Sequence, residues 1–305
     1  MREPRLVPDA EPASYYGRAI LKPPVWKQPD VPLYLYLGGV AGVSAVLAEG
    51  AASTGRPSLQ RAARLAAAGG AALGTVALVH DLGRPERFLN MLRVFKPTSP
   101  LSVGSWVLAP FAGLAAGAAI SEVTGLLPRI GRLAGAGAAV LGPVLATYTG
   151  ALISNTAVPA WHEGHREMPF LFAGSACTAA GGIALIGTTP DQSGPARKLA
   201  IIGAGLEIAA AELLLRRLGM VAEPYRQGRP GTMMRAARNL TVAGVGVSLL
   251  GRRSRVLSAI AGASFQAASV LTRFGVFQAG LASAADPKYT VGPQRERMRA
   301  RTLAE

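Results

Sequence analysis

The sequence predicts an all-α integral membrane protein with eight transmembrane helices. Half of its 305 residues are hydrophobic. Only 16% are charged, against about 25% in ordinary globular proteins. Long uncharged segments recur along the chain, and an apolar run of about 20 residues crosses the bilayer core as a helix. The same composition excludes an intrinsically disordered chain, which would be poor in hydrophobic residues.

Five of the expected spans are strongly apolar, and within them Arg273 is the one charged residue. They are Val31–Ala48, Val103–Ile120, Leu133–Ala160, Met168–Pro190 and Val256–Ala285. Three weaker candidates complete the set: Leu65–His80, Leu199–Leu215 and Asn239–Gly251. Around this membrane domain, residues 31–285, we expect an extended N-terminal arm, residues 1–30, and a polar C-terminal tail, residues 286–305. The arm lacks the apolar core of a cleavable signal peptide, so none is predicted.

Basic residues are distributed unevenly between the two faces that eight spans would create. Of 32 Lys and Arg residues, 21 lie on the side that holds both termini, 10 lie in the opposite loops, and Arg273 is within a span. Loops rich in Lys and Arg tend to stay in the cytoplasm, which places both termini there and the protein in the plasma membrane. In the alternative interpretation, the basic face docks an acidic partner protein.

All three histidines of the chain are expected at the face that carries the termini. His80 precedes Asp81 at the end of a span, where a carboxylate would orient the imidazole. Tyr148 and Asn155 lie in the fourth span, which ends at the same face. Such groups suit a quinone headgroup, which needs hydrogen-bond donors at its oxygens and protons on reduction. The alternatives are a helix cap for His80 and Asp81, and interhelical packing for Tyr148.

Neither a metal site nor a haem site is predicted. His162 and His165 are three residues apart, whereas the helical zinc motif places its histidines four apart. A haem between spans would need histidines inside the helices, and the strongly apolar spans contain none. The single cysteine, Cys177, excludes a disulfide framework and an iron–sulfur cluster of the chain's own, because clusters usually need about four thiolates.

The segment after His80 is predicted to form a short amphipathic helix over Pro85–Lys96. It would lie on the membrane surface or present its arginines to a partner. The three tryptophans, at positions 26, 106 and 161, are expected to form an aromatic belt at this interface. The candidates for partner docking are Trp26, Arg84, Arg87, Arg93 and His162.

Three charged residues are expected inside the membrane, with Glu207 and Glu212 in the sixth span and Arg273 in the eighth. Intramembrane charges are costly and are by default candidates for function. Two interpretations stay open: a proton path, or a buried ion pair in which Arg273 pairs with Glu212. The same residues support an alternative function, transport of a small solute or ion.

The chain resembles the NrfD/PsrC family of membrane subunits. The arm contains Tyr15-Tyr16-Gly17 and Pro23-Pro24-Val25-Trp26, followed by Tyr36-Leu37-Gly38-Gly39. The segment from His80-Asp81-Leu82-Gly83-Arg84-Pro85 through Met91-Leu92 to Gly104-Ser105-Trp106 is similar to the signature loop of the family. Tyr148-Thr149-Gly150 is similar to its tyrosine segment.

The resemblance implies two four-helix bundles that form the membrane anchor of a molybdopterin oxidoreductase, without a haem. Such a subunit exchanges electrons between a membrane quinone, here expected to be menaquinone, and a four-cluster iron–sulfur subunit. A separate molybdopterin subunit, of the formate dehydrogenase or polysulfide reductase type, carries the terminal catalytic residues. The resemblance also implies that Tyr148 is a quinone ligand. We therefore expect a quinone-reactive subunit with no catalytic residues for the terminal substrate and no nucleic-acid partner.

Overall fold

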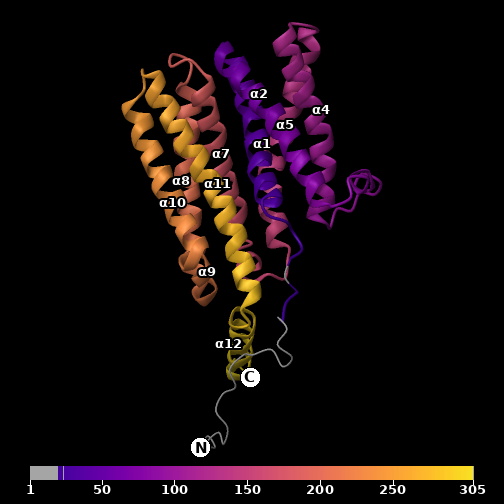
Figure 1. The fold of residues 1–305 in the computed structure, drawn as a ribbon, viewed down its shortest axis with the longest axis vertical. Helices are drawn as coiled ribbons and strands as arrows, with labels where there is room; N and C mark the ends of the chain where they lie inside the picture. Colours follow the sequence, from indigo (N-terminus) through magenta and orange to yellow (C-terminus); the bar gives the residue numbers. More distant parts are fainter. Residues whose placement is uncertain (1–19, 23, 305) are drawn as a thin grey trace, which may run out of the picture.

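The computed structural model describes residues 20–22 and 24–304, and the regular secondary structure of that part is helical (Figure 1). Eight helices of 20 to 31 residues form its body. They are α1 (Asp30–Ser53), α2 (Pro57–Asp81), α4 (Pro100–Thr124), α5 (Pro128–Ser154), α7 (Met168–Gly187), α8 (Gly194–Arg217), α10 (Gly228–Leu250) and α11 (Arg255–Ala285). Shorter elements connect or follow them: α3 (Arg87–Asn90), α6 (Pro159–His162), the 3₁₀ turn η1 (Gly219–Ala222), α9 (Glu223–Arg226) and α12 (Lys288–Ala304). The expected all-α class is confirmed.

Five of these helices, namely α1, α2, α4, α5 and α7, are long and apolar enough to cross a membrane. A multi-pass membrane protein is therefore confirmed. Each of the other three expected spans also forms one long helix, α8, α10 or α11. These three helices are long enough to cross a membrane but are not apolar enough to meet the same criterion. The count of eight spans consequently stays a prediction.

The helices form two sets that lie side by side in Figure 1. In one set α1 packs along α2 and α5, and α4 packs on α5. In the other set α7 packs along α8 and α11, and α10 packs along α11. Small residues permit the helix backbones to approach one another closely, as expected for helices in lipid. At the crossing of α1 and α5, a Cβ added to Gly42 would lie 2.3 Å from the carbonyl oxygen of Gly142.

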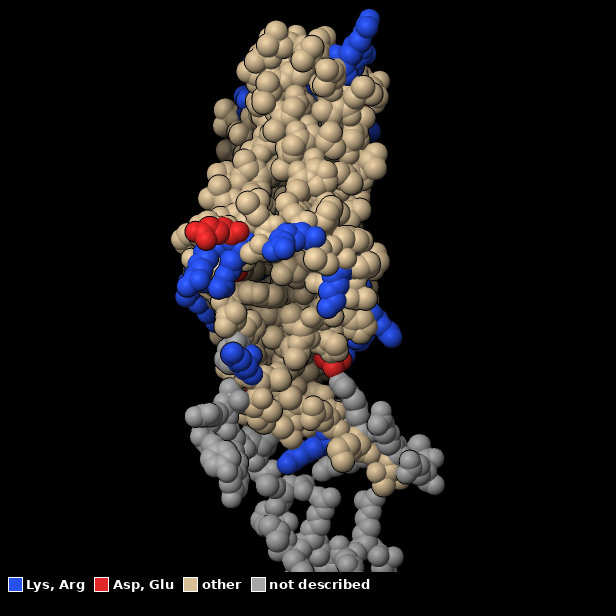
Figure 2. Space-filling model, turned by 90° about the vertical axis from the view of Figure 1, so that its right-hand side faces the viewer, with Lys and Arg blue, Asp and Glu red and all other residues tan. Residues whose placement is uncertain are grey.

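The helices end at two faces, which we name by the arm. The arm face is the end at which α1 begins and α2, α5, α8 and α11 end, and the far face is the opposite end (Figure 1). Figure 2 shows charged side chains gathered toward the arm face and others at the far end, with a broad uncharged band between them. Such a band is what a bilayer core requires of a protein surface.

Several expected elements differ in extent from the structure. The spans expected at Leu65–His80 and Asn239–Gly251 begin earlier, at Pro57 and Gly228. The span expected at Leu133–Ala160 ends at Ser154, because Pro159 lacks a backbone N–H and its ring would clash with the carbonyl of Asn155 in a continued helix. The amphipathic helix expected over Pro85–Lys96 is wrong: α3 has four residues, and turns follow it. A helix as short as the expected Pro85–Lys96 segment is marginally stable unless tertiary packing supports it.

Candidate functional site

His80, in the last turn of α2, is paired with Asp30 and not with Asp81. His80 Nδ1 lies 2.7 Å from Asp30 Oδ2, and the side chains are 73% and 12% exposed respectively. Asp81 Oδ1 instead accepts a hydrogen bond of 2.8 Å from the backbone N–H of Lys27. Adjacent helical residues point about 100° apart, so His80 and Asp81 meet different neighbours. The predicted pairing with Asp81 is therefore wrong, and the sequence analysis did not single out Asp30.

Tyr148 of α5 is buried beside Tyr34 of α1. The ring centroids lie 6.5 Å apart in an edge-on arrangement. The Tyr148 ring passes over Gly104 of α4, where an added Cβ would lie 2.1 Å from a ring carbon. Its hydroxyl is buried without a hydrogen-bond partner among the described residues. Since an unsatisfied buried polar group costs about 1–3 kcal/mol, this hydroxyl is suited to a ligand that brings an acceptor.

Tyr34 connects the His80–Asp30 pair to Tyr148. It follows Asp30 by four residues on α1, and residues at this spacing lie on one helix face. His80, Asp30, Tyr34 and Tyr148 thus form a polar and aromatic series at the arm face, which we call the arm-face cluster. Asn155 is exposed at the C-cap of α5 and contributes no side-chain hydrogen bond to the cluster.

Trp161 belongs to the protein core, so its assignment to an interfacial belt is wrong. It is fully buried, and its Nε1 donates a hydrogen bond of 2.8 Å to the carbonyl of Val276. Trp26 of the arm stacks on it with ring centroids 5.6 Å apart, and both rings contact Phe277. The arm is therefore anchored on the protein by its tryptophan. Trp106 is exposed, as expected for a belt residue.

The basic candidates for partner docking lie free on the surface. Arg84, Arg87 and Arg93 are exposed, and in the described part of the chain their side chains make no hydrogen bond or ion pair. His162 is also exposed, with its ring 6.3 Å from that of His165. No group of three His, Cys, Asp or Glu residues that could hold a metal occurs among the residues described.

The intramembrane charges are arranged differently from the expected ion pair. Arg273 is fully buried, donates a hydrogen bond of 2.8 Å to the carbonyl of Phe172, and lies over the Phe172 ring at 3.8 Å. Glu212 pairs with Arg238 of α10 at 2.5 Å. The predicted pairing of Arg273 with Glu212 is thus wrong. Glu207 and Glu212 lie about 140° apart on α8, which directs Glu212 to α10 and Glu207 to α11.

Glu207 is a buried carboxylate with one free oxygen. Its Oε1 accepts a hydrogen bond of 2.7 Å from Thr272, whereas its Oε2 has no partner within the described chain. It lines a cavity of about 170 Å³ between α8, α10 and α11. Glu212, Arg238 and Tyr225 line the same cavity. A free carboxylate oxygen in such a place suits a hydrogen-bond donor or a cation.

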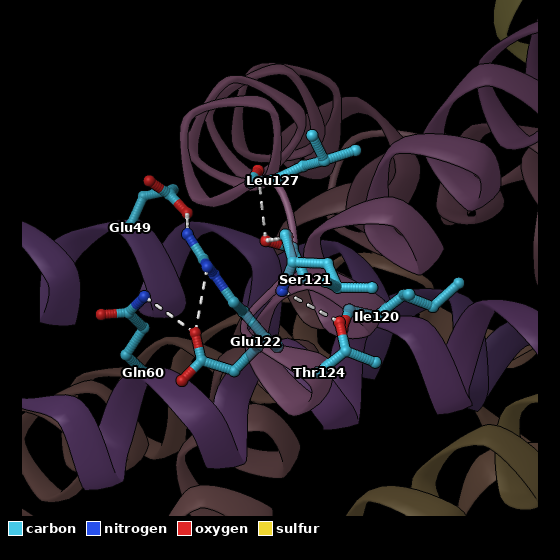
Figure 3. A network of polar contacts seen from close by, with 9 residues as sticks. Glu49, Gln60, Ile120, Ser121, Glu122, Thr124 and Leu127 are labelled. Atoms are coloured by element: carbon cyan, nitrogen blue, oxygen red, sulfur yellow. Dashed lines mark hydrogen bonds and ion pairs between the residues drawn. The ribbon is translucent and has the colours of Figure 1, made fainter.

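A buried ionic network, shown in Figure 3, was missed by the sequence analysis. Arg64 of α2 is 5% exposed, and its guanidinium contacts Glu49 Oε1 at 2.9 Å and Glu122 Oε2 at 3.1 Å. Gln60 donates to the same Glu122 oxygen. Gly135 of α5 makes room for the network, because a Cβ there would lie 2.2 Å from Glu49 Oε1. The apolar segments stop one residue before Glu49 and begin one residue after Arg64, whereas the helices continue through both.

The long apolar helices and the uncharged band around them (Figure 2) define an all-α multi-pass membrane protein. Within that class the chain belongs to the NrfD family: the family model described as polysulphide reductase, NrfD, matches residues 21–189, which is more than half of the chain. The resemblance seen in the sequence is thereby confirmed. Members are membrane subunits of molybdopterin oxidoreductase complexes and generally partner with molybdopterin and iron–sulfur subunits. A comparison with curated proteins gives no match.

Proposed function

We propose that this chain is the quinone-reactive membrane anchor of a molybdopterin oxidoreductase, passing electrons between menaquinone and a four-cluster iron–sulfur subunit. The observation that carries the proposal is the buried, unpartnered hydroxyl of Tyr148, one tyrosine away from the His80–Asp30 pair. The terminal chemistry, of the formate dehydrogenase or polysulfide reductase type, belongs to the separate molybdopterin subunit.

In this proposal Tyr148 donates its free hydrogen bond to one oxygen of the quinone headgroup. Reduction of a quinone to a quinol takes up two electrons and two protons. His80 is largely exposed and is oriented by Asp30, so it can carry protons between water and the site. Asp81 and Asn155 are further polar groups at the same face. The electrons pass through the iron–sulfur subunit, because this chain has one cysteine.

The docking surface proposed for the iron–sulfur subunit is the arm face. Arg84, Arg87 and Arg93 offer free guanidinium groups there, and His162 and the anchored Trp26 lie at the same end. Exposed arginines with no partner of their own suit an acidic surface. By the distribution of Lys and Arg, this face is in the cytoplasm, and the helices form eight spans in two four-helix bundles in the plasma membrane.

The proposal is tested in the assembled complex with Tyr148→Phe and His80→Ala. Both variants should slow quinone-linked turnover and leave the half-reaction with an artificial dye unchanged, because the dye bypasses the membrane subunit. Tyr225→Phe is a matched control, since Tyr225 is a buried tyrosine whose hydroxyl already donates to the carbonyl of Ala160. Normal quinone turnover in Tyr148→Phe and His80→Ala would refute the assignment of the site.

A second candidate, a small-solute or ion transporter, rests on the free oxygen of Glu207 in its cavity. It predicts substrate-dependent flux across liposomes that contain this chain alone. Glu207→Gln should abolish that flux, whereas Glu212→Gln, which breaks a half-exposed pair, should reduce it less. No flux in the unmodified protein would exclude this candidate.

A further inference from the structure

A groove of about 820 Å³ lies between α2 and α7 and is floored by α1. Its walls are apolar, and Leu65, Leu73 and Ile186 are exposed there. Gly69 faces open space, since an added Cβ would meet no atom within 4 Å. The volume is within the range of about 300–1,000 Å³ typical of ligand pockets.

The groove is longer than the hydrocarbon part of one membrane leaflet. Along α2 it extends from Ser58 near the far face to Leu73, which at about 1.5 Å per residue is about 22 Å. Half of the hydrocarbon core measures about 15 Å. A molecule that fills the groove therefore has an apolar part that spans one leaflet and a polar part at the membrane surface.

A single unpaired cation lies at the surface end of the groove. Arg61 is in the first turns of α2, is exposed, and makes no side-chain hydrogen bond or ion pair with any part of the chain described. Glu122 also lines the groove, but its carboxylate is held by Arg64 and Gln60. Glu49 lies beyond Arg64, against Gly135. Arg64 is thus already shared by two carboxylates, and Arg61 is the cation of the described lining that is left to meet a ligand's phosphate.

The surface end of the groove is held in place before any ligand arrives. The backbone N–H of Ser58 donates to the side chain of Gln192 at 2.8 Å, and the N–H of Thr189 donates to Ser58 Oγ at 3.1 Å. These bonds join the first turn of α2 to the loop after α7. The backbone of Arg61, one turn from Ser58, is therefore held beside the groove.

The deep end offers little to a polar headgroup. Tyr36 lies on the floor, but its hydroxyl donates to Gln266, whose amide in turn donates to the carbonyl of Ala179. The single phenolic proton is therefore already used. The Tyr36 hydroxyl therefore has no proton left to donate to a quinone headgroup.

We propose that this groove binds one membrane phospholipid with an anionic headgroup. The phosphate contacts Arg61, and an acyl chain lies along Leu65, Gly69 and Leu73 of α2 and against Ile183 and Ile186 of α7. Basic groups between transmembrane helices at the membrane surface bind such headgroups. The lipid fills the space between the two sets of helices and does not depend on the quinone site.

The test is lipid retention. The purified full-length chain is incubated with an equimolar mixture of phosphatidylglycerol and phosphatidylethanolamine in detergent, washed, and analysed for bound lipid by native mass spectrometry. We expect the unmodified protein to prefer phosphatidylglycerol by about fivefold, as one arginine at a lipid surface provides. Arg61→Gln should abolish this preference, and Arg61→Lys should keep it. Arg132→Gln is the matched control: Arg132 is an exposed, unpaired arginine near the far-face end of α5.

A second variant tests the groove itself. Gly69→Leu places a side chain in open space and should reduce retention of both lipids without loss of folding. Equal retention of the two lipids by the unmodified protein would overturn the proposal, as would equal losses in Arg61→Gln and Arg132→Gln. Retention of added menaquinone that Gly69→Leu abolishes, without preference for phosphatidylglycerol, would assign the groove to a quinone instead.

Discussion

Asp30, the first residue of α1, holds the imidazole of His80 at the end of α2, with 2.7 Å between Oδ2 and Nδ1. The contact joins residues 50 positions apart, at the point where the arm enters the membrane domain. It leaves His80 mostly exposed while its partner is mostly buried. A histidine so placed is held by the protein on one side and reached by water on the other.

Asp30→Asn should lower quinone-linked turnover by about tenfold, because an amide orients the imidazole less firmly than a carboxylate does. Asp81→Asn should have a smaller effect, because Asp81 accepts from the Lys27 backbone and not from His80. Quinone-linked turnover of the assembled complex is measured for both variants. Equal effects of the two variants would contradict a special role for Asp30.

Tyr148→Phe should separate stability from function. The lost hydroxyl has no partner among the described residues, so its removal should leave the free energy of unfolding unchanged or raise it by about 1 kcal/mol. Tyr225→Phe should instead lower it by about 1 kcal/mol, because the Ala160 carbonyl loses its donor. Unfolding by denaturant in detergent is the measurement. A marked loss of stability in Tyr148→Phe would show that its hydroxyl is satisfied within the protein.

Arg64→Met should be severely destabilising, by about 3–5 kcal/mol, because it leaves Glu49 and Glu122 in a mostly buried place without their cation. Arg238→Met breaks a half-exposed pair with Glu212 and should cost less than about 1 kcal/mol. The triple variant Arg64→Met, Glu49→Gln, Glu122→Gln should recover part of the loss. Thermal unfolding measures the stability of the three variants. Equal losses of stability in Arg64→Met and Arg238→Met would contradict the role of the network.

The attachment of α12 should depend on pH. Glu223 accepts hydrogen bonds from Lys288 at 2.9 Å and from Tyr289 at 3.0 Å, and these lower the pKa of the Glu223 carboxyl below its ordinary value of 4.5. The stabilisation is therefore present above pH 4.5 and is lost as the pH falls through the lowered pKa. The same partners, first the Glu223 carboxylate, raise the pKa of Lys288 above its ordinary value of 10.5, so the stabilisation is fully present below pH 10.5 and is lost as the pH rises through the raised pKa.

Hydrogen exchange of residues 288–292 against pH measures this attachment. Protection should be constant at neutral pH and should fall in strong acid. Glu223→Gln should remove the acid step, because an amide does not titrate in this range. An acid step that survives in Glu223→Gln would assign the transition to another group.

Local sequence was a reliable guide to helices and a poor guide to the partners of their charges. The alternation of spans correctly placed His80 and Tyr148 at one face, because each apolar segment reverses the direction of the chain. It could not predict that Glu212 would pair with Arg238, since the apolar faces of α8 and α10 do not indicate how the two helices are rotated. The Arg64 network was missed because its members lie just beyond the apolar segments.

The sequence by itself determined that this chain crosses a membrane and which segments form helices, because a helix satisfies its backbone hydrogen bonds within one segment and lipid offers no others. It also carried the family signature around His80. Only the tertiary structure decided which charged groups meet: Asp30 and not Asp81 with His80, Arg238 and not Arg273 with Glu212. Such pairs depend on how each helix is rotated against its neighbours, and that rotation is set by packing across the whole molecule.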